Sequence, residues 1–159
     1  MNYAFFNRPA DIVARELLGT IIIRKIHGKE KQVIIVETEA YFDERDPASR
    51  ACFNGDLRAT MLMEGGTILV YGIHNNWLVN IVTGNKGIAS AVLIRAVEPL
   101  NFNERCNGPG LLTRALSIGK EFHKLNKNET RHFIFMDDSY ATYFAKNILQ
   151  TFINLSLYV

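Results

Sequence analysis

The chain has 159 residues, of which 48% are hydrophobic and 21% charged, and its formal net charge is +2. This size and composition are those of one ordinary globular domain, so we expect residues 1–159 to fold as a single domain. The small net charge does not by itself indicate a nucleic-acid-binding protein, although a local stripe of basic residues is compatible with it. A signal-peptide pattern and an apolar run of membrane-spanning length are both missing, which predicts a cytoplasmic protein.

Cysteine and histidine usage gives no sign of a metal centre. The two cysteines, Cys52 and Cys106, indicate reduced thiols rather than a disulfide scaffold. The four histidines are scattered, without the paired spacing of metal ligands. We therefore expect no metal site and no cofactor.

The first predicted elements are a helix and two antiparallel strands. Pro9 suits the first turn of a helix, Asp11 favours its positive end, and Gly19 ends it. Thr20–Ile26 is rich in β-branched residues and is predicted to be a strand. His27–Glu30 has the composition of a hairpin turn that leads into the next strand.

The segment Gln32–Tyr41 is the centre of the predicted fold. Its first half is apolar and β-branched, which indicates a strand buried on both faces. Strand side chains alternate with a period of two, so one face is predicted to carry Val33, Ile35, Glu37, Glu39 and Tyr41. That face begins in the core and ends with two carboxylates and an aromatic ring. It marks either a functional site or simply the place where the strand emerges into water.

The rest of the chain predicts a polar loop, further strands and further helical segments. The loop, Phe42–Asp56, leaves the carboxylate end of the central strand, and loops on a rigid scaffold often carry function. The predicted strands are Thr67–Tyr71, Trp77–Val82 after the turn Gly72–Asn76, Ala89–Val97, His132–Met136 and Phe152–Val159. Leu57–Met63 is a short amphipathic segment, and a helix follows Asn107–Gly110.

Arg95 is the one charge in the apolar strand Ala89–Val97. A guanidinium in such a strand needs an anion, and the sequence offers Glu37, Glu39 or a bound phosphate.

Several short motifs follow one another in a distinctive order. They are Phe5-Phe6 with Pro9, Ala14-Arg15, Leu17-Leu18-Gly19, Val36-Glu-Thr-Glu-Ala-Tyr41, Asp46-Pro-Ala-Ser49, Gly66 with Val70-Tyr71, Asn80, Leu93-Ile94-Arg95-Ala96, Glu98-Pro99-Leu100, and Gly108-Pro109 with Leu112. This series resembles the alkyladenine (3-methyladenine) DNA glycosylase family of base excision repair. The resemblance covers most of Phe5–Ile118 and becomes faint after Ile118.

The resemblance implies a fold class and a mechanism. The fold is α+β, a curved and mostly antiparallel sheet with flanking helices and a DNA-inserting β-hairpin. The partner is double-stranded DNA containing damaged purines, bound through its minor groove by a monomer. A damaged purine is rotated out of the stack, and a carboxylate activates a water that attacks the sugar carbon. Neither a metal nor a lysine nucleophile is needed, so strand cleavage is not expected.

The resemblance also assigns individual residues. Glu39 matches the general base, and Arg95 matches the arginine that helps to hold the water. Tyr41 and Tyr71 match two aromatic walls of the base pocket. Asn80 matches an amide that disfavours the extra amino group of guanine, and Leu93 matches the neighbouring pocket position.

Each assignment has a structural alternative. Tyr71 and Leu93 also suit a plain core, and Asn80 suits a hydrogen-bonded strand amide. Glu39 and Arg95 also suit a structural ion pair, and Glu37 is assigned to structure, paired with a basic neighbour.

Three departures from the family pattern bear on activity. Arg50 stands where the family has a histidine that stacks on the flipped base. A guanidinium also stacks on a base, but Arg50 could instead pair with Glu39, lower its basicity and block the water. The hairpin from Tyr71 to Asn80 is one residue shorter than in the family, which places the intercalating side chain at or near His74, with Trp77 as a rival. The C-terminal third is also abbreviated.

Two function classes follow. The first is an enzyme, a monofunctional glycosylase that releases alkylated purines. The alternative is a catalytically impaired relative that recognises distorted duplex DNA without cleavage. The position of Arg50, facing the pocket or closed on Glu39, separates them.

Overall fold

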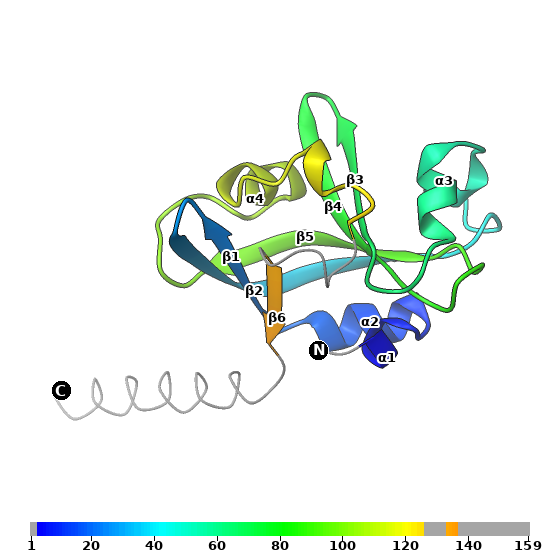
Figure 1. The fold of residues 1–159 in the computed structure, drawn as a ribbon, viewed down its shortest axis with the longest axis horizontal. Coiled ribbons are helices and arrows are strands. Elements are labelled where there is room, and N and C mark those ends of the chain that lie inside the picture. The colour runs from blue at the N-terminus through cyan, green and yellow to red at the C-terminus, as the bar shows by residue number, and fades with distance from the viewer. Residues whose placement is uncertain (1–2, 126–132, 137–159) are drawn as a thin grey trace, which may run out of the picture.

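A curled antiparallel sheet forms the body of the protein (Figure 1), which a computed structural model describes over residues 3–125 and 133–136. Its strands are β1 (Ile21–Ile26), β2 (Lys29–Tyr41), β3 (Ile68–Ile73), β4 (Asn76–Val82), β5 (Ala91–Pro99) and β6 (Phe133–Met136). They lie in the order β3-β4-β5-β2-β1-β6, and every neighbouring pair is antiparallel. The long strands β2 and β5 therefore occupy the centre of the sheet.

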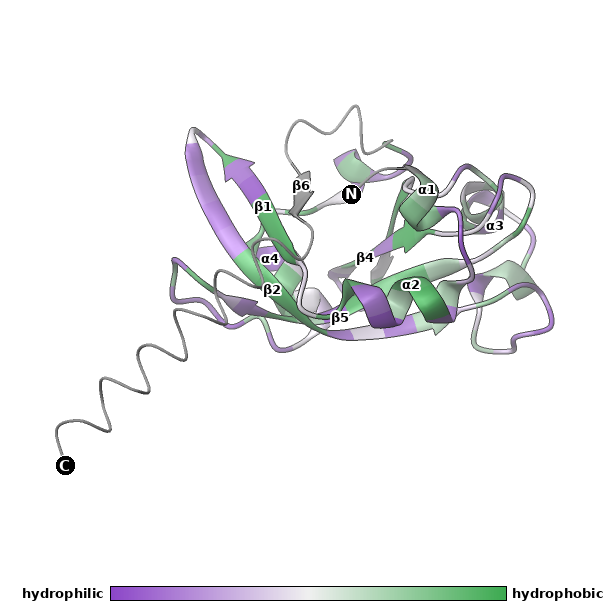
Figure 2. Cartoon of the chain, turned by 90° about the horizontal axis from the view of Figure 1, so that it is seen from below, coloured by the Kyte–Doolittle hydropathy of each residue, from purple (hydrophilic) through white to green (hydrophobic). Residues whose placement is uncertain are grey.

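Short helices pack around this sheet. They are α1 (Tyr3–Phe6), α2 (Ala10–Leu17), α3 (Asp56–Met61) and α4 (Pro109–Ala115), with single 3-10 turns η1 (Arg50–Cys52) and η2 (Lys120–Phe122). Helix α2 runs alongside β2 and β5 (Figure 2), and the Thr38 hydroxyl of β2 donates a hydrogen bond of 2.9 Å to the Ala14 carbonyl of α2. Helix α4 packs on β4 and β5. In the described part of the chain, no helix has the length and apolarity to cross a membrane.

Most predicted elements are confirmed, and with them the α+β class and the antiparallel sheet. The predicted turn Gly72–Asn76 is wrong in length, because β3 continues to Ile73 and β4 begins at Asn76. The predicted strand His132–Met136 corresponds to β6. The predicted strand Phe152–Val159 lies outside the described residues, and the extension of one domain to residue 159 stays a prediction.

Two hydrophobic clusters hold the layers together. The main cluster joins α1, α2 and α4 to the sheet and includes Phe6, Val13, Leu17, Ile22, Val33, Ile35, Ile81, Val92, Ile94, Leu112 and Leu116. The second cluster contains Ala51, Met61, Leu69, Val82, Ala89 and Ala91, and Tyr41 and Tyr71 pack against it. It connects the loop after β2 and helix α3 to the sheet.

The pairing of β2 with β5 is irregular around Glu37. Ile35 pairs with Val97, Glu37 with Ala96 and Thr38 with Ile94, so the ladder skips Val36 on one strand and Arg95 on the other. An extra residue in a strand reverses the face on which the following side chains lie. Accordingly, Val33 and Ile35 belong to the main cluster before the irregularity, and after it Ala40 packs against the same cluster.

Two expectations for Gln32–Tyr41 are therefore wrong. The strand is not buried on both faces, because Val36 is 53% exposed. Glu37, Glu39 and Tyr41 also do not continue the face of Val33 and Ile35. Tyr41 packs against the second cluster instead. The two glutamates and Tyr41 therefore lie on the side of the sheet opposite to the main cluster.

Arg24 of β1 ties the sheet to the end of α4. Its side chain is almost fully buried, and its guanidinium donates to the Leu116 carbonyl at 3.1 Å and to the Ser117 carbonyl at 3.3 Å. The guanidinium also lies 4.8 Å from the Phe122 ring centroid. Carbonyls at a helix C-terminus have no partner within the helix, so Arg24 satisfies groups that are otherwise costly to bury.

We expect Arg24→Met to lower the free energy of unfolding by about 2 kcal/mol, because it leaves these carbonyls without a donor. Urea denaturation measures the change. The matched control is Arg15→Met, which removes a side chain that is 73% exposed, and we expect it to change the free energy by less than about 0.5 kcal/mol. Equal effects of the two substitutions would contradict the capping role of Arg24.

Candidate active site

Arg95 binds both glutamates at the carboxylate end of β2. Its Nε donates to Glu37 at 2.8 Å, and its Nη1 donates to Glu39. The hydrogen bond to Glu39 and then that to Glu37 raise the pKa of Arg95, so the guanidinium stays charged. The side chain of Glu39 remains 35% exposed, so water reaches its carboxylate. The expected anion for Arg95 is thus the glutamate pair, and the structural role of Glu37 is confirmed.

Tyr41 lies two residues beyond Glu39 on the same strand. Burial, and secondly hydrogen bonding with the Glu39 carboxylate, raise the pKa of the Tyr41 phenol well above its ordinary value. The phenol is therefore protonated at neutral pH and acts as a donor toward Glu39. Arg95 orients this carboxylate, and the Tyr41 phenol lies beside it.

An aromatic pocket adjoins Tyr41 where the ends of several elements meet. Its lining residues are Tyr41, Arg50, Met61, Leu69, Tyr71, Asn80 and Ala91. The pocket is almost filled, with a free volume of about 10 Å³. Four of the predicted site residues thus line this one pocket, namely Tyr41, Arg50, Tyr71 and Asn80. Sequence reasoning missed Met61, Leu69 and Ala91, although the period of two in β3 would have placed Leu69 beside Tyr71.

Asn80 and Leu93 occupy neighbouring positions on β4 and β5. They are paired across the strands, and Leu93 also pairs with Glu39. The Asn80 amide is 1% exposed and donates to the Leu69 carbonyl at 3.3 Å, so it is both a bonded strand amide and a pocket wall. Leu93 is 2% exposed and lies between Asn80 and Glu39 without lining the cavity itself.

Arg50 projects from η1 over the ring of Tyr71. Its guanidinium carbon lies 5.3 Å from the ring centroid, within cation–π range. Within the described residues, Arg50 forms no ion pair with Glu39, whose partner is Arg95. Of the two positions open to Arg50, the structure therefore has the one that faces the pocket.

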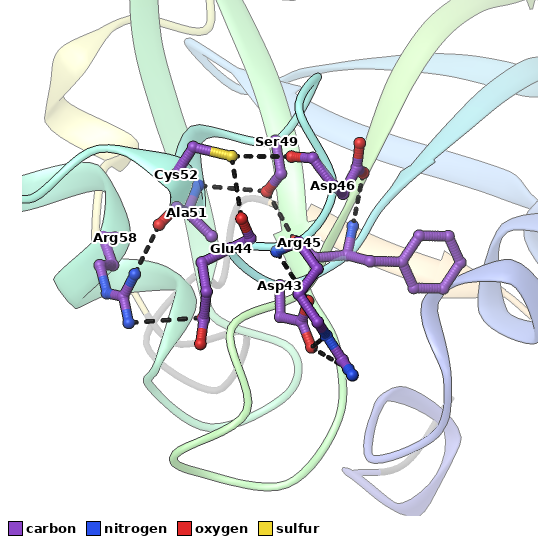
Figure 3. A network of polar contacts seen from close by, with 9 residues as sticks. Asp43, Glu44, Arg45, Asp46, Ser49, Ala51, Cys52 and Arg58 are labelled. Atoms are coloured by element: carbon purple, nitrogen blue, oxygen red, sulfur yellow. Dashed lines mark hydrogen bonds and ion pairs between the residues drawn. The ribbon is translucent and has the colours of Figure 1, made fainter.

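The loop that carries Arg50 is fastened to the end of β2 (Figure 3). Asp46 accepts a hydrogen bond of 3.0 Å from the backbone N–H group of Phe42. It accepts a second one, also of 3.0 Å, from the N–H group of Ala48. The Ser49 hydroxyl donates to the Phe42 carbonyl at 2.6 Å and accepts from the Ala51 N–H at 3.1 Å. The Asp46-Pro-Ala-Ser49 motif therefore has a physical role, which is to hold the backbone of η1 against the strand. Sequence reasoning used this motif only as part of a resemblance.

The β3–β4 hairpin ends in a two-residue turn. His74 and Asn75 both have positive φ, 47° and 62°, as a type I′ turn requires, and both are exposed. The hairpin stands out from the sheet in Figure 1. His74 is thus at the tip. Trp77 lies below it on the strand, paired with Gly72 and 38% exposed.

Helix α4 supports this hairpin from one side. The Thr113 hydroxyl donates to the Trp77 carbonyl at 2.8 Å, and Arg114 donates to the Asn76 side chain at 3.2 Å. Gly110 allows the close approach, because a Cβ there would lie 2.7 Å from the Cβ of Asn76. The turn is therefore held in a defined position by the helix.

A larger hollow of about 620 Å³ lies apart from these residues. It is bounded by the start of α2, the loop after β2 and the β4–β5 loop, and it contains none of the predicted site residues. Its arginines are already paired, Arg8 with Glu16 and Arg45 with Asp43. The chemistry of the site therefore belongs to the smaller aromatic pocket.

Comparison with known proteins gives a consistent result. The sequence profile of the family described as "Methylpurine-DNA glycosylase (MPG)" matches residues 4–151. A protein of Aeropyrum pernix is 45% identical over 121 residues, which are 74% of this chain and 62% of that protein. A protein of Borreliella afzelii is 42% identical over 136 residues, 79% of this chain and 72% of that protein. One from Myxococcus xanthus is 39% identical over 129 residues, 76% and 65% of the two chains. All three are named "Putative 3-methyladenine DNA glycosylase".

The raised pKa of Tyr41 gives a pH-dependent stability. In the unfolded chain this phenol ionises near its ordinary pKa of 10.0, whereas in the folded protein it stays protonated to higher pH. The contribution of Tyr41 is therefore complete below about pH 10 and declines as the pH rises further. We expect the difference in unfolding free energy between the parent protein and Tyr41→Phe to fall between about pH 9 and pH 11 in urea titrations. A constant difference would contradict the assignment.

Proposed function

Because the chain belongs to the methylpurine-DNA glycosylase family, we propose that it is a monofunctional DNA glycosylase that excises alkylated purines of the 3-methyladenine type in base excision repair. The chain spans 62% of the length of the Aeropyrum pernix relative. Its activity, substrate and DNA partner are therefore proposals. The observation that carries the proposal is Glu39, exposed to water and oriented by Arg95 beside an aromatic pocket.

The proposed reaction is hydrolysis of the bond between the sugar and the base. The damaged purine is rotated out of the duplex toward the pocket, at a cost of a few kcal/mol that is smaller for a poorly paired base. Glu39 accepts a proton from water, and the water oxygen attacks C1′ of the sugar as the C1′–N bond breaks. The bonding electrons leave with the base. The nucleophile is water and not an amine, so the product is an abasic site in an unbroken strand.

Arg95 and Tyr41 are proposed to prepare Glu39 for this step. Arg95 donates to its carboxylate and the Tyr41 phenol lies beside it, which fixes the orientation of Glu39 beside the bound sugar. The same guanidinium is placed to hold the attacking water. A carboxylate that was free to rotate would align with C1′ only part of the time.

The pocket residues are proposed to recognise the base. Tyr41 and Tyr71 supply stacking faces, and Asn80 supplies a buried amide that disfavours the amino group of guanine. Leu93 closes the wall between Asn80 and Glu39. A free volume of about 10 Å³ is far too small for a purine, so entry of the base requires Arg50 to leave the face of Tyr71.

His74 is proposed to fill the gap left by the extruded nucleotide. It lies at the tip of the projecting hairpin, whereas Trp77 lies lower on the strand and against the backbone of Gly72. The support of α4 at Asn76 and Trp77 suits a hairpin that has to push into a base stack.

One observation favours the alternative of a duplex-binding relative without activity. Arg50 occupies the aromatic pocket and leaves almost no free volume. A protein whose Arg50 stayed in place would bind distorted DNA but could not accept a base. Base release by the purified protein decides between the two functions.

The central test is Glu39→Gln. We expect this substitution to reduce release of 3-methyladenine from alkylated duplex DNA by about 10²–10⁴-fold while duplex binding persists, because the amide cannot accept the proton of water. Glu37→Gln is the matched control, since Glu37 is on the same strand and binds the same arginine, and we expect a much smaller loss. Equal release by Glu39→Gln and the parent would remove Glu39 from this role. Binding without release by the parent would establish the alternative.

The hairpin assignment is tested with His74→Gly and Asn75→Gly. Glycine accepts the positive φ of both positions, so the turn is kept and only the side chain is lost. We expect His74→Gly to reduce single-turnover release from duplex DNA by about tenfold, and Asn75→Gly to have little effect. Single-stranded DNA needs no wedge, so release from it should change much less. A large loss in Trp77→Ala and none in His74→Gly would transfer the role to Trp77.

A further inference from the structure

We propose that Arg50 shifts the selectivity of the base pocket toward neutral purine lesions, such as hypoxanthine and ethenoadenine, and away from cationic ones, such as 7-methylguanine and 3-methyladenine. The inference rests on the proposed function, because it concerns the base that the same pocket receives. It follows from the Arg50 guanidinium, which lies in the pocket lining and has no ion-pair partner among the described residues.

The charge of Arg50 is not compensated by the acidic residues around it. Glu39 is engaged by Arg95, and Glu44 pairs with Arg58 at 3.4 Å. Asp46 faces backbone N–H groups of its own loop. Among the described residues, no carboxylate lies within ion-pair distance of Arg50, whose contact is the face of Tyr71. Arg50 therefore adds to the pocket lining one positive charge that has no ion-pair partner among the described residues.

The backbone beneath Arg50 prevents the charge from moving far away. Ala51, the next residue, is fully buried, and its N–H and carbonyl are bound by Ser49 and Arg58. Only the side chain of Arg50 is free to swing. When a purine takes the face of Tyr71, the displaced guanidinium stays at the rim of the same pocket.

The two lesion classes differ in the charge that they bring to this pocket. Alkylation at N7 of guanine or N3 of adenine makes the nucleotide cationic, whereas hypoxanthine and ethenoadenine are neutral. A half-buried cation repels a second cation strongly at short range, because the effective dielectric constant is well below that of water. The same guanidinium stacks favourably on a neutral purine.

The discrimination acts on binding more than on bond cleavage. In both classes, water gives a proton to Glu39 and an oxygen to C1′, and the C1′–N bond breaks. The electron pair goes to the base in both cases. A cationic base leaves neutral, and a neutral base leaves as an anion that takes a proton from solvent. Because the change in charge on the base is the same, Arg50 affects the two cleavage steps alike and the two binding steps differently.

The test compares release of hypoxanthine and 7-methylguanine, each from one position in the same duplex, under single-turnover conditions over a range of protein concentrations. We expect Arg50→Gln to raise the relative efficiency for 7-methylguanine by about tenfold at subsaturating protein, and to change the ratio of the two maximal rates much less. Arg50→Lys keeps the charge and should keep the parent's ratio. Intrinsic differences between leaving groups cancel, because the same two substrates are compared in every variant.

Arg45→Gln is the matched control, since it removes an exposed arginine from the same loop that is paired with Asp43. It should leave the ratio unchanged. A second measurement is the affinity of Glu39→Gln, and of Glu39→Gln with Arg50→Gln, for the two duplexes, where the same shift is expected without cleavage. An unchanged ratio in Arg50→Gln, or an equal shift in Arg45→Gln, would overturn the inference. Release of neither base by the parent, with the binding shift present, would instead refute the proposed glycosylase activity alone.

Discussion

The irregular pairing of β2 with β5 is the constraint on which the rest of the site depends. Skipping Val36 and Arg95 in the ladder lets β2 keep its apolar residues in the main cluster on both sides of the irregularity. Beyond the same point, the side chains of Glu37 and Glu39 lie on the opposite side of the sheet, where both form ion pairs with Arg95. A regular strand would have directed these carboxylates into the main cluster, at a prohibitive cost in desolvation.

The loop after β2 then builds the second half of the site. Asp46 and Ser49 hold it through backbone hydrogen bonds, so η1 returns over the sheet and places Arg50 on Tyr71. Glu39 and two residues of the pocket lining, Tyr41 and Arg50, are therefore parts of one continuous stretch of chain. Their separation is determined by a few short hydrogen bonds.

The hairpin is a third, independently supported part. Its type I′ turn needs only two residues with positive φ, and α4 holds its returning strand at Asn76 and Trp77. Because β4 also supplies Asn80, the tip and the pocket are linked by one rigid strand. The tip of the hairpin and the pocket are thus kept at a set distance, which the proposed extrusion of a base requires.

The sequence by itself determined the order and type of most elements, the need of Arg95 for an anion, and the family. These properties depend on local composition, periodicity and short motifs, which a linear chain displays directly. Only the tertiary structure decided which face of β2 carries Glu39, where Arg50 points, and that the pocket is nearly filled. The period of two predicts one face for a whole strand, whereas a bulge reverses it through pairing with residues about 60 positions away. Arg50 likewise had two acceptable positions in sequence, facing the pocket or closed on Glu39. Its position over Tyr71 came from hydrogen bonds that fix the loop in three dimensions.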